Sequence, residues 1–297
     1  MSRTPPSDVE ITADTVRRLL REQHPDLAPE PVTVLANGWD NVIARVGDDL
    51  LARLPRREKA AQLVLAEQAW LPTLAPRLPL SVPVPVRTGV PTSFYPYAWS
   101  LTPWLPGRPV VSGDGGTAEI DPLGTALALG EFLGALHHPA PPHAPTHLTR
   151  GVPLLDRRVL DDRNAALVAD GAHLVEALET GRDVKPWPHE PLWLHGDLHP
   201  ANILVHEGQI GAVIDFGDIT AGDPATDLAV AWMLVPAHTR DAFWGQYAQA
   251  VPFLDENLVV RARAWAAAFA LVFLANSADN PQMAAIGRAT SRALRAE

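Results

Sequence analysis

The segment that most constrains the fold of this 297-residue chain is residues 194–217, where polar side chains alternate with short apolar runs. Asp197 and Asn202 stand five residues apart, and Asp215 follows thirteen residues after Asn202. The apolar runs between the last two are residues 203–205 and 212–214. Each run has the length of a short strand and a turn separates them, so the sequence predicts a hairpin that returns Asp215 to Asn202.

These three polar residues have the chemistry that phosphoryl transfer requires. A carboxylate at Asp197 can orient an attacking hydroxyl and accept its proton, a role typically worth about a hundred- to ten-thousandfold in rate. The amide oxygen of Asn202 and the carboxylate of Asp215 are ligands that Mg²⁺ prefers. Taken singly, each residue would be interpreted as a turn or a cap. Together they follow the order in which kinase-like enzymes place a base and two metal ligands, so phosphoryl transfer is the leading hypothesis.

Two neighbours of Asp197 admit another interpretation. His195 is expected to have a structural role in the loop, but His195 and His199 together also suggest a fragment of a metallohydrolase site. No further cluster of His, Asp or Glu with ligand spacing accompanies them in the sequence, which argues against that alternative. Gly217 is expected to give the backbone freedom after the metal-binding carboxylate.

The bulk composition is that of an ordinary globular protein. Hydrophobic residues make up 47% and charged residues 20%, and a chain of this length can bury the cores of two domains or lobes. With a net charge of −10, the chain lacks the basic surface expected of a nucleic-acid binder, and the negative charge weakly favours a cationic substrate. The absence of cysteine excludes disulfides, thiolate metal sites and catalytic thiols.

The apolar segments do not predict a membrane protein. Residues 1–10 contain no apolar signal core, and the longest near-continuous apolar run, residues 264–275, is too short to cross a bilayer. We therefore expect a buried helix at residues 264–275 and a cytoplasmic protein, either a monomer or a weak dimer.

Hydrophobic periodicity in the first third of the chain predicts a small, mostly antiparallel sheet with helices beside it. The expected helices are residues 11–22, capped by Thr12 or Asp14, and residues 57–74. The expected strands are residues 32–35, 42–46, 50–54, 82–86 and 98–104. The breaker cluster Pro106-Gly107-Arg108-Pro109 predicts a boundary, which divides the chain into residues 1–105 and 106–297.

Helical patterns dominate the second part. The expected helices are residues 122–137, one or two within 155–178, and residues 223–234, 240–250, 256–276 and 283–296. Short strands at residues 192–194, 203–205 and 212–214 are expected around the motif. A small sheet-rich lobe followed by a larger helical lobe indicates an α+β architecture.

The chain resembles the aminoglycoside phosphotransferase family and its macrolide-kinase relatives, within the kinase-like superfamily. The resemblance is strongest over residues 195–227 and extends to residues 38–57 and 99–107, ending in Trp104-Leu105-Pro106-Gly107. It implies a two-lobed kinase-like fold that binds ATP or GTP in its cleft. By position, it assigns the base to Asp197 and the Mg²⁺ ligands to Asn202 and Asp215.

The resemblance also implies roles for residues of the first lobe. A hairpin loop over the phosphates would include Asn37, Gly38 and Trp39, and a hinge that pairs with the purine would include Ser100, Leu101 and Thr102. Arg53 stands where relatives usually have a phosphate-binding lysine, and it is expected to pair with Glu67. The rival basic residues for the phosphate contact are Arg56, Arg57 and Lys59. In the second lobe, Asp223 is expected to cap a helix and Asp227 to support the catalytic loop.

The acceptor is expected to be a small molecule with a hydroxyl group, such as an aminoglycoside or a macrolide, possibly a cationic one. The resemblance implies an acceptor site in the helical lobe. The candidate acids there are Asp156, Asp161, Asp162, Asp255, Glu256 and Asp279. Trp232, Trp244 and Trp265 are expected in the core, with the alternative that one of them faces a ligand. Two alternatives stay open: a metabolite kinase of the same fold, and a catalytically silent nucleotide-binding module.

Overall fold

The computed structural model describes residues 6–251, 254 and 256–296, which form two compact units. The smaller unit contains the described residues up to Pro76 together with residues 82–105. The larger unit contains residues 77–81 and the described residues from Pro106 onward. Residues 77–81 precede the expected boundary, yet Ser81 hydrogen-bonds to Gly211 and Val213 of the larger unit.

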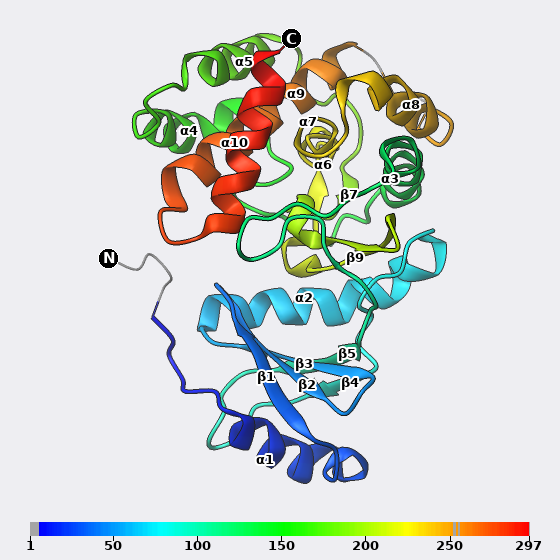
Figure 1. Cartoon of the computed structure of the whole chain (residues 1–297), viewed down its shortest axis with the longest axis vertical. Coiled ribbons are helices and arrows are strands. Elements are labelled where there is room, and N and C mark those ends of the chain that lie inside the picture. The colour runs from blue at the N-terminus through cyan, green and yellow to red at the C-terminus, as the bar shows by residue number, and fades with distance from the viewer. Residues whose placement is uncertain (1–5, 252–253, 255, 297) are drawn as a thin grey trace. The chain divides into compact units, whose positions relative to one another are not determined.

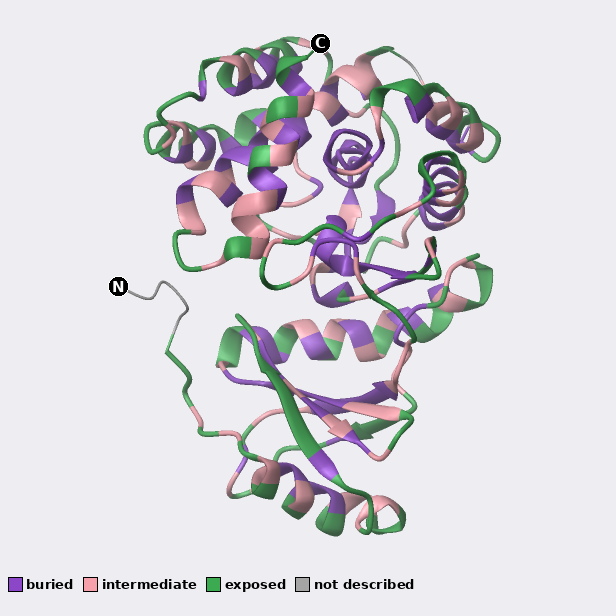
Figure 2. Cartoon of the chain, in the orientation of Figure 1, coloured by how far each residue is buried: buried purple, intermediate pink, exposed green. Residues whose placement is uncertain are grey.

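The smaller unit is a sheet with a helix on each side (Figure 1). Its elements are α1 (Ala13–Gln23), β1 (Val32–Asn37), β2 (Asn41–Val46), β3 (Leu50–Pro55), α2 (Glu58–Leu74), β4 (Arg87–Gly89) and β5 (Trp99–Pro103). The strand order is β1-β2-β3-β5-β4, and every neighbouring pair is antiparallel. Figure 2 shows β1 almost wholly exposed, as expected for an edge strand.

Alternation along the strands determines what each helix covers. On β3, Ala52 and Leu54 are buried in a core that includes Val16, Leu19 and Leu20 of α1. Successive side chains of a strand point to opposite faces, so Arg53 points to the face that α2 covers. The sequence of β3 therefore supplies one apolar face and one functional side chain.

One predicted strand of this unit is wrong. Residues 82–86 were expected to form it, but the strand that pairs with β5 is β4, at Arg87–Gly89. Pro83 and Pro85 have no N–H group to donate to a ladder, which confines the regular pairing to the residues after them. Val86 still donates one hydrogen bond to the Leu101 carbonyl oxygen.

The larger unit is mostly helical and contains two small sheets. Its helices are α3 (Pro122–Leu136), α4 (Arg158–Ala165), α5 (Ala172–Asp183), α6 (Ala225–Leu228), α7 (Val230–Met233), α8 (Ala237–Ala248), α9 (Glu256–Asn276) and α10 (Pro281–Arg295). Its strands are β6 (Arg108–Pro109), β7 (Leu192–Leu194), β8 (Ile203–His206), β9 (Gln209–Val213) and β10 (Thr220–Gly222). The strands pair as β6-β8-β9 and as β10-β7, and all the pairs are antiparallel.

Helix α9 is the central helix of this unit. It packs against α4, α5, α6 and α10, and it matches the predicted span at residues 256–276. By length and composition it could cross a membrane, but 72% of its apolar window is buried inside the protein. Gly181 of α5 permits the close approach of the two helices, because a Cβ atom there would lie 2.2 Å from the Cβ of Ala264.

Other predicted boundaries in this unit change in detail. The segment 155–178 divides into a 3-10 turn at Leu154–Arg157, followed by α4 and α5, and the segment 223–234 divides into α6 and α7. Strand β10 was not predicted. Its three residues are a threonine, an alanine and a glycine, which are too few and too small to give a hydrophobic alternation.

Candidate active site

Asp197 lies in a tight loop directly after strand β7. The loop turns at Gly196, whose φ is +85° and whose missing Cβ atom would lie 2.2 Å from the Asp218 carbonyl oxygen. Only glycine fits both the left-handed backbone and the close approach. The Asp197 side chain remains 24% exposed, so it is accessible to a reacting group.

His195 has the structural role that the sequence predicted. Its Nδ1 accepts a hydrogen bond from the Asp197 N–H group at 3.3 Å, so the proton is on Nε2, which donates to the Ile214 carbonyl oxygen at 2.9 Å. The ring is fully buried and packs on Phe216 with 4.5 Å between ring centroids. Both nitrogens are engaged, so His195 does not act as the base.

The predicted hairpin brings Asn202 and Asp215 together. Strands β8 and β9 pair from Ile203 to Val213, and the Ile214 N–H group then donates to the Asn202 carbonyl oxygen at 2.9 Å. Asp215 takes a left-handed backbone conformation, with φ 65° and ψ 63°. Gly217 was expected to take an unusual backbone conformation, but it lies in the following 3-10 turn. The left-handed conformation occurs at Asp215 instead.

Asn202 and Asp215 carry the oxygen donors that a magnesium ion prefers, so they are the candidate metal ligands. The Asn202 amide nitrogen donates to the Asp197 carbonyl oxygen at 3.0 Å, which leaves the amide oxygen available to a metal ion. Two oxygen ligands are sufficient for Mg²⁺ when phosphates and water complete its shell. Among the described residues, there is no cluster of three or more His, Asp or Glu side chains that could hold a metal ion. The metallohydrolase alternative therefore lacks a ligand set.

Asp227 supports the loop that carries Asp197, as predicted. Its carboxylate accepts hydrogen bonds from the N–H groups of His195, at 2.7 Å, and Gly196, at 2.9 Å. Behind it, His137 Nε2 lies 3.3 Å from Asp227 Oδ2, and His137 Nδ1 lies 2.9 Å from the Tyr247 hydroxyl oxygen. Burial raises the pKa of Tyr247, so its hydroxyl stays protonated. A buried chain of side chains thus extends from α8 to the loop.

The Asp197 carboxylate contacts two groups that the sequence did not indicate. Arg150 Nη2 lies 2.9 Å from Asp197 Oδ1, and His199 Nε2 lies 3.4 Å from Asp197 Oδ2. Burial alone would raise the pKa of Asp197, but the charges of Arg150 and His199 outweigh it and hold the pKa well below its usual range. Arg150 has no motif around it, so the only signal is its proximity in the folded chain.

Arg53 and Glu67 form the predicted pair in the smaller unit. Arg53 Nη1 lies 3.1 Å from Glu67 Oε1, and the exposed fractions of the two side chains are 9% and 0%. The pair joins β3 to α2 because both side chains occupy the face between them. Removing one partner of such a buried pair typically costs about 3–5 kcal/mol.

The turn expected to cover phosphates is a tight hairpin connection between β1 and β2. Gly38 donates its N–H to the Asn41 carbonyl oxygen at 2.9 Å, and Trp39 at the tip is 49% exposed. Arg56 donates to the Gly38 carbonyl oxygen at 2.8 Å, and Arg57 pairs with Asp40. These two arginines, two of the three rivals of Arg53 for the phosphate contact, hold the turn. Asn37 is the last residue of β1.

The expected hinge residues lie inside the sheet. Ser100 and Leu101 of β5 pair with β3 on one side and β4 on the other, and both are fully buried. Thr102 pairs with Leu51 of β3 and is 4% exposed. The Ser100 hydroxyl accepts a hydrogen bond from Gln68 at 2.9 Å. Sheet pairing therefore occupies the backbone of Ser100 and Leu101, so these two residues do not offer the free edge that a purine needs.

The candidate acceptor acids are mostly exposed or already neutralised. Asp161 is fully buried between Arg157, at 2.8 Å, and Arg182, at 3.5 Å, which gives it a structural role. The exposed acids of the set are Asp156, Asp162, Glu256 and Asp279. Asp255 lies outside the described residues. Trp232 and Trp265 are buried as expected, whereas Trp244 is partly exposed.

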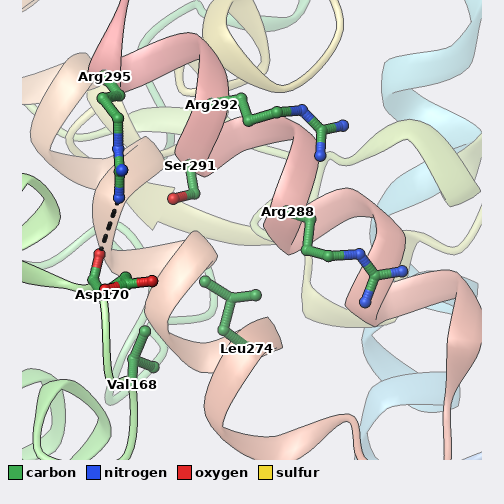
Figure 3. A pocket seen from close by; sticks show the side chains of 7 residues that line it. All are labelled: Val168, Asp170, Leu274, Arg288, Ser291, Arg292 and Arg295. Atoms are coloured by element: carbon green, nitrogen blue, oxygen red, sulfur yellow. Dashed lines mark hydrogen bonds between the residues drawn. The ribbon is translucent and has the colours of Figure 1, made fainter.

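A cavity of about 360 Å³ opens elsewhere in the larger unit (Figure 3). Its lining residues are Val168, Asp170, Leu274, Arg288, Ser291, Arg292 and Arg295. Arg295 donates to the Asp170 carbonyl oxygen at 3.2 Å across it. None of the predicted site residues lines this cavity, so it is not part of the candidate active site.

Comparison with known proteins extends these observations over most of the chain. The family profile described as "Phosphotransferase enzyme family" matches residues 31–266. No curated protein matches the sequence. Solved structures with the same fold do exist, at low sequence identity.

Three of these solved structures show how far the likeness extends. The GDP and kanamycin complex of APH(2")-IIia has a TM-score of 0.71 at 19% identity, over 95% of this chain and 98% of that one. The macrolide 2'-phosphotransferase MphH from Brachybacterium faecium has a TM-score of 0.64 at 22% identity, over 96% and 99%. The streptomycin and ATP ternary complex of APH(2")-IIa has a TM-score of 0.58 at 16% identity, over 87% of each chain.

Proposed function

This chain belongs to the phosphotransferase enzyme family, and from that premise we propose that it transfers the γ-phosphate of ATP or GTP to a hydroxyl group of a small molecule. The arrangement of Asp197, Asn202 and Asp215 on one loop and hairpin is the observation that supports this proposal. Asp197 orients the attacking hydroxyl and accepts its proton. A strong base is not needed, because a loose phosphoryl-transfer transition state requires little proton abstraction.

The other site residues bind and position the nucleotide. Asn202 and Asp215 hold Mg²⁺, which when bound neutralises charge on the phosphates. Arg53, held by Glu67, contacts phosphate oxygens bidentately, as a planar guanidinium can. The turn from Asn37 to Trp39 covers the phosphates. Thr102 remains a candidate for the purine contact. It pairs with β3 on one side, but it lies beyond Leu101, the last residue of β5 that pairs with β4 on the other side.

The complexes of the similar structures suggest the first acceptors and donors to test. They include kanamycin, streptomycin and a macrolide kinase, and both GDP and ATP occur as nucleotides. Aminoglycosides, macrolides and primary metabolites with hydroxyl groups are therefore the screening set. We place the protein in the cytoplasm, where these nucleotides are available, as a monomer or a weak dimer.

Replacement of the base tests this function. The variant Asp197→Ala should lose turnover by at least about a hundredfold, the usual contribution of a positioned base, with nucleotide affinity largely retained. The matched control is Asp183→Ala, which removes an exposed carboxylate at the end of α5 and should leave turnover unchanged. Near-full activity of the Asp197 variant, in a coupled assay for the released nucleoside diphosphate, would contradict the mechanism.

A binding measurement distinguishes the two alternatives that the sequence left open. Titration calorimetry with ATP and GTP, with and without Mg²⁺, detects nucleotide binding independently of turnover. Binding without turnover of any acceptor would indicate a silent module, and turnover of primary metabolites alone would indicate a metabolite kinase. The presence of all three polar residues of the motif favours an active enzyme over the silent module.

A further inference from the structure

The cavity of Figure 3 lies in the larger unit, between α10, the end of α9 and the segment before α5. Its volume of about 360 Å³ is within the range of sites that bind small molecules. Three of its seven lining residues are arginines of α10, namely Arg288, Arg292 and Arg295, and one is an acid, Asp170. The lining therefore carries an excess of positive charge, in a chain whose net charge is −10.

The three arginines share one face of α10. Positions 288, 292 and 295 are four and three residues apart, the spacing that places side chains next to one another along a helix. Like charges at this spacing repel each other. Arg292 and Arg295 belong to the last turn, where an arginine also interacts favourably with the helix dipole, but Arg288 lies a turn earlier. The helix dipole therefore does not account for the whole row.

None of these three guanidinium groups is neutralised by an acid in the part of the chain that the structure describes. Arg295 donates to the Asp170 carbonyl oxygen at 3.2 Å, which is an uncharged partner. On the neighbouring helices the arginines are paired: Arg158 lies 3.1 Å and Arg182 2.6 Å from carboxylate oxygens of Glu179. The row on α10 thus keeps its positive charge for another anion.

A hydroxyl group on the same face adds a neutral donor. Arg295 can only donate, so its contact with His173 Nδ1 at 3.4 Å places the ring proton on Nε2. This Nε2 lies 3.0 Å from the Ser291 hydroxyl oxygen and 3.1 Å from the Ser291 carbonyl oxygen. The hydroxyl oxygen can therefore accept from His173 and donate its own hydrogen to a ligand in the cavity.

The cavity also has an apolar side. Leu274 and Val168 are both half-buried and line it together with the arginines. Figure 3 shows Leu274 between Arg295, which reaches Asp170, and Arg288 at the other end of the cavity. The cavity thus offers positive charge and apolar surface to the same ligand.

We propose that this cavity is a second binding site of the protein, for a small phosphate monoester with an apolar substituent. Such a group carries about −1.5 to −2 charges at pH 7, which matches three arginines offset by one aspartate. Arginine binds phosphate oxygens bidentately, and Ser291 supplies a further donor. The substituent contacts Leu274 and Val168. The site is independent of the proposed transfer reaction, because none of the candidate active-site residues lines it.

Three probes separate the charge from the apolar contact. Phenyl phosphate has both, inorganic phosphate has the charge alone, and phenol has the ring alone. Binding of each to the 297-residue protein is measured by titration calorimetry at one salt concentration. The variants are Arg288→Gln and Arg292→Gln. The matched control is Arg21→Gln, which removes the same charge from an exposed arginine in the last turn of another helix, α1.

The expected result is binding that depends on the arginines of α10. Phenyl phosphate should bind wild type and Arg21→Gln equally well. Arg288→Gln and Arg292→Gln should each weaken its binding by about fivefold or more, the upper range for one exposed ion pair. Inorganic phosphate should bind about tenfold more weakly than phenyl phosphate, because it lacks the apolar contact. Phenol should show no binding that depends on either arginine.

A chemical readout locates the binding on the wild-type protein. Phenylglyoxal modifies exposed guanidinium groups, and peptide mass spectrometry reports the extent of modification at each arginine. Phenyl phosphate should protect Arg288 and Arg292 from the reagent, while Arg21 should be modified to the same extent with and without the ligand.

Three results would overturn the inference. Wild-type affinity for phenyl phosphate in both arginine variants would place the binding elsewhere, and so would a lack of protection at Arg288 and Arg292. Co-sedimentation with vesicles of phosphatidylglycerol, without binding of phenyl phosphate, would indicate a membrane surface as the partner in place of a small molecule. Failure of the proposed function leaves these outcomes unchanged, because none of them depends on turnover.

Discussion

At the scale of single residues, the Asp197 carboxylate is tuned by its partners. Arg150 and His199 stabilise its ionised form and lower its pKa. Removing the guanidinium in Arg150→Gln takes away part of that stabilisation, so the pKa of Asp197 should rise. For Asp197 as the proposed base, a smaller fraction is then ionised at acidic pH, and the acid limb of kcat/KM against pH should move to higher pH.

The pH profiles of three proteins check this expectation. Wild type, Arg150→Gln and Arg150→Lys are compared with the same nucleotide and acceptor, so that titration of the substrates cancels. The lysine variant keeps the charge and should keep the wild-type limb. Superimposable acid limbs in wild type and Arg150→Gln would show that Arg150 does not control this ionisation.

Asp227 has a different effect, on the backbone of the loop. Asp227→Ala leaves the buried N–H groups of His195 and Gly196 without acceptors, each at a cost of about 1–3 kcal/mol. We expect a lower free energy of unfolding and a reduced kcat. Tyr247→Phe removes only the hydroxyl that bonds His137, so it should cost about 1 kcal/mol. Urea unfolding and kcat are measured for both, and equal effects of the two changes would contradict this ranking.

At the scale of elements, the contact of α5 with α9 depends on a small residue. A methyl group at Gly181 would overlap Ala264, so Gly181→Ala should destabilise the protein by roughly 1–3 kcal/mol through overpacking. Gly245→Ala on α8 is the matched control, because a Cβ atom there has no neighbour within 4 Å. It should stabilise the helix by up to about 1 kcal/mol. Calorimetric melting of both variants should give shifts of opposite sign.

The elements that the sequence predicted well are those whose own residues determine them. Helix α9 was predicted at its observed bounds because its apolar pattern is long, and the hairpin β8–β9 follows from two apolar runs around a turn. Residues 82–86 do not form the predicted strand, because Pro83 and Pro85 have no N–H group to donate to a ladder. The loop that carries Arg150 has no regular structure, and its conformation depends on partners as distant as Thr226.

The site residues divide in the same way, into those that a local motif predicts and those that only the folded chain brings together. The roles of His195 and Asp227 follow from their place in the motif, and the structure confirms both hydrogen-bonding roles. The Arg150 contact joins residues 47 positions apart in the sequence and arises only from tertiary folding. The sequence does not show that β4 pairs with Ser100 and Leu101 of the expected hinge, because three residues of strand give too little pattern.

At the scale of the whole molecule, nucleotide binding should be measurable as stability. A nucleotide at a hundred times its dissociation constant should stabilise the folded state by about 2.7 kcal/mol. The melting temperature is measured with ATP and with GTP, each with Mg²⁺ and with EDTA. The nucleotide with the larger magnesium-dependent shift is the preferred donor. No shift with either nucleotide would contradict nucleotide binding by this chain.

The left-handed backbone of Asp215 affects how its carboxylate can be studied. Asparagine visits this conformation readily, whereas alanine pays a penalty there. Asp215→Asn therefore changes the charge and keeps the turn, while Asp215→Ala changes both at once. A loss of magnesium dependence in the alanine variant could come from the lost carboxylate or from the changed turn. The same loss in the asparagine variant would come from the lost carboxylate alone. The shape of the main chain thus decides which mutant reports on the side chain alone.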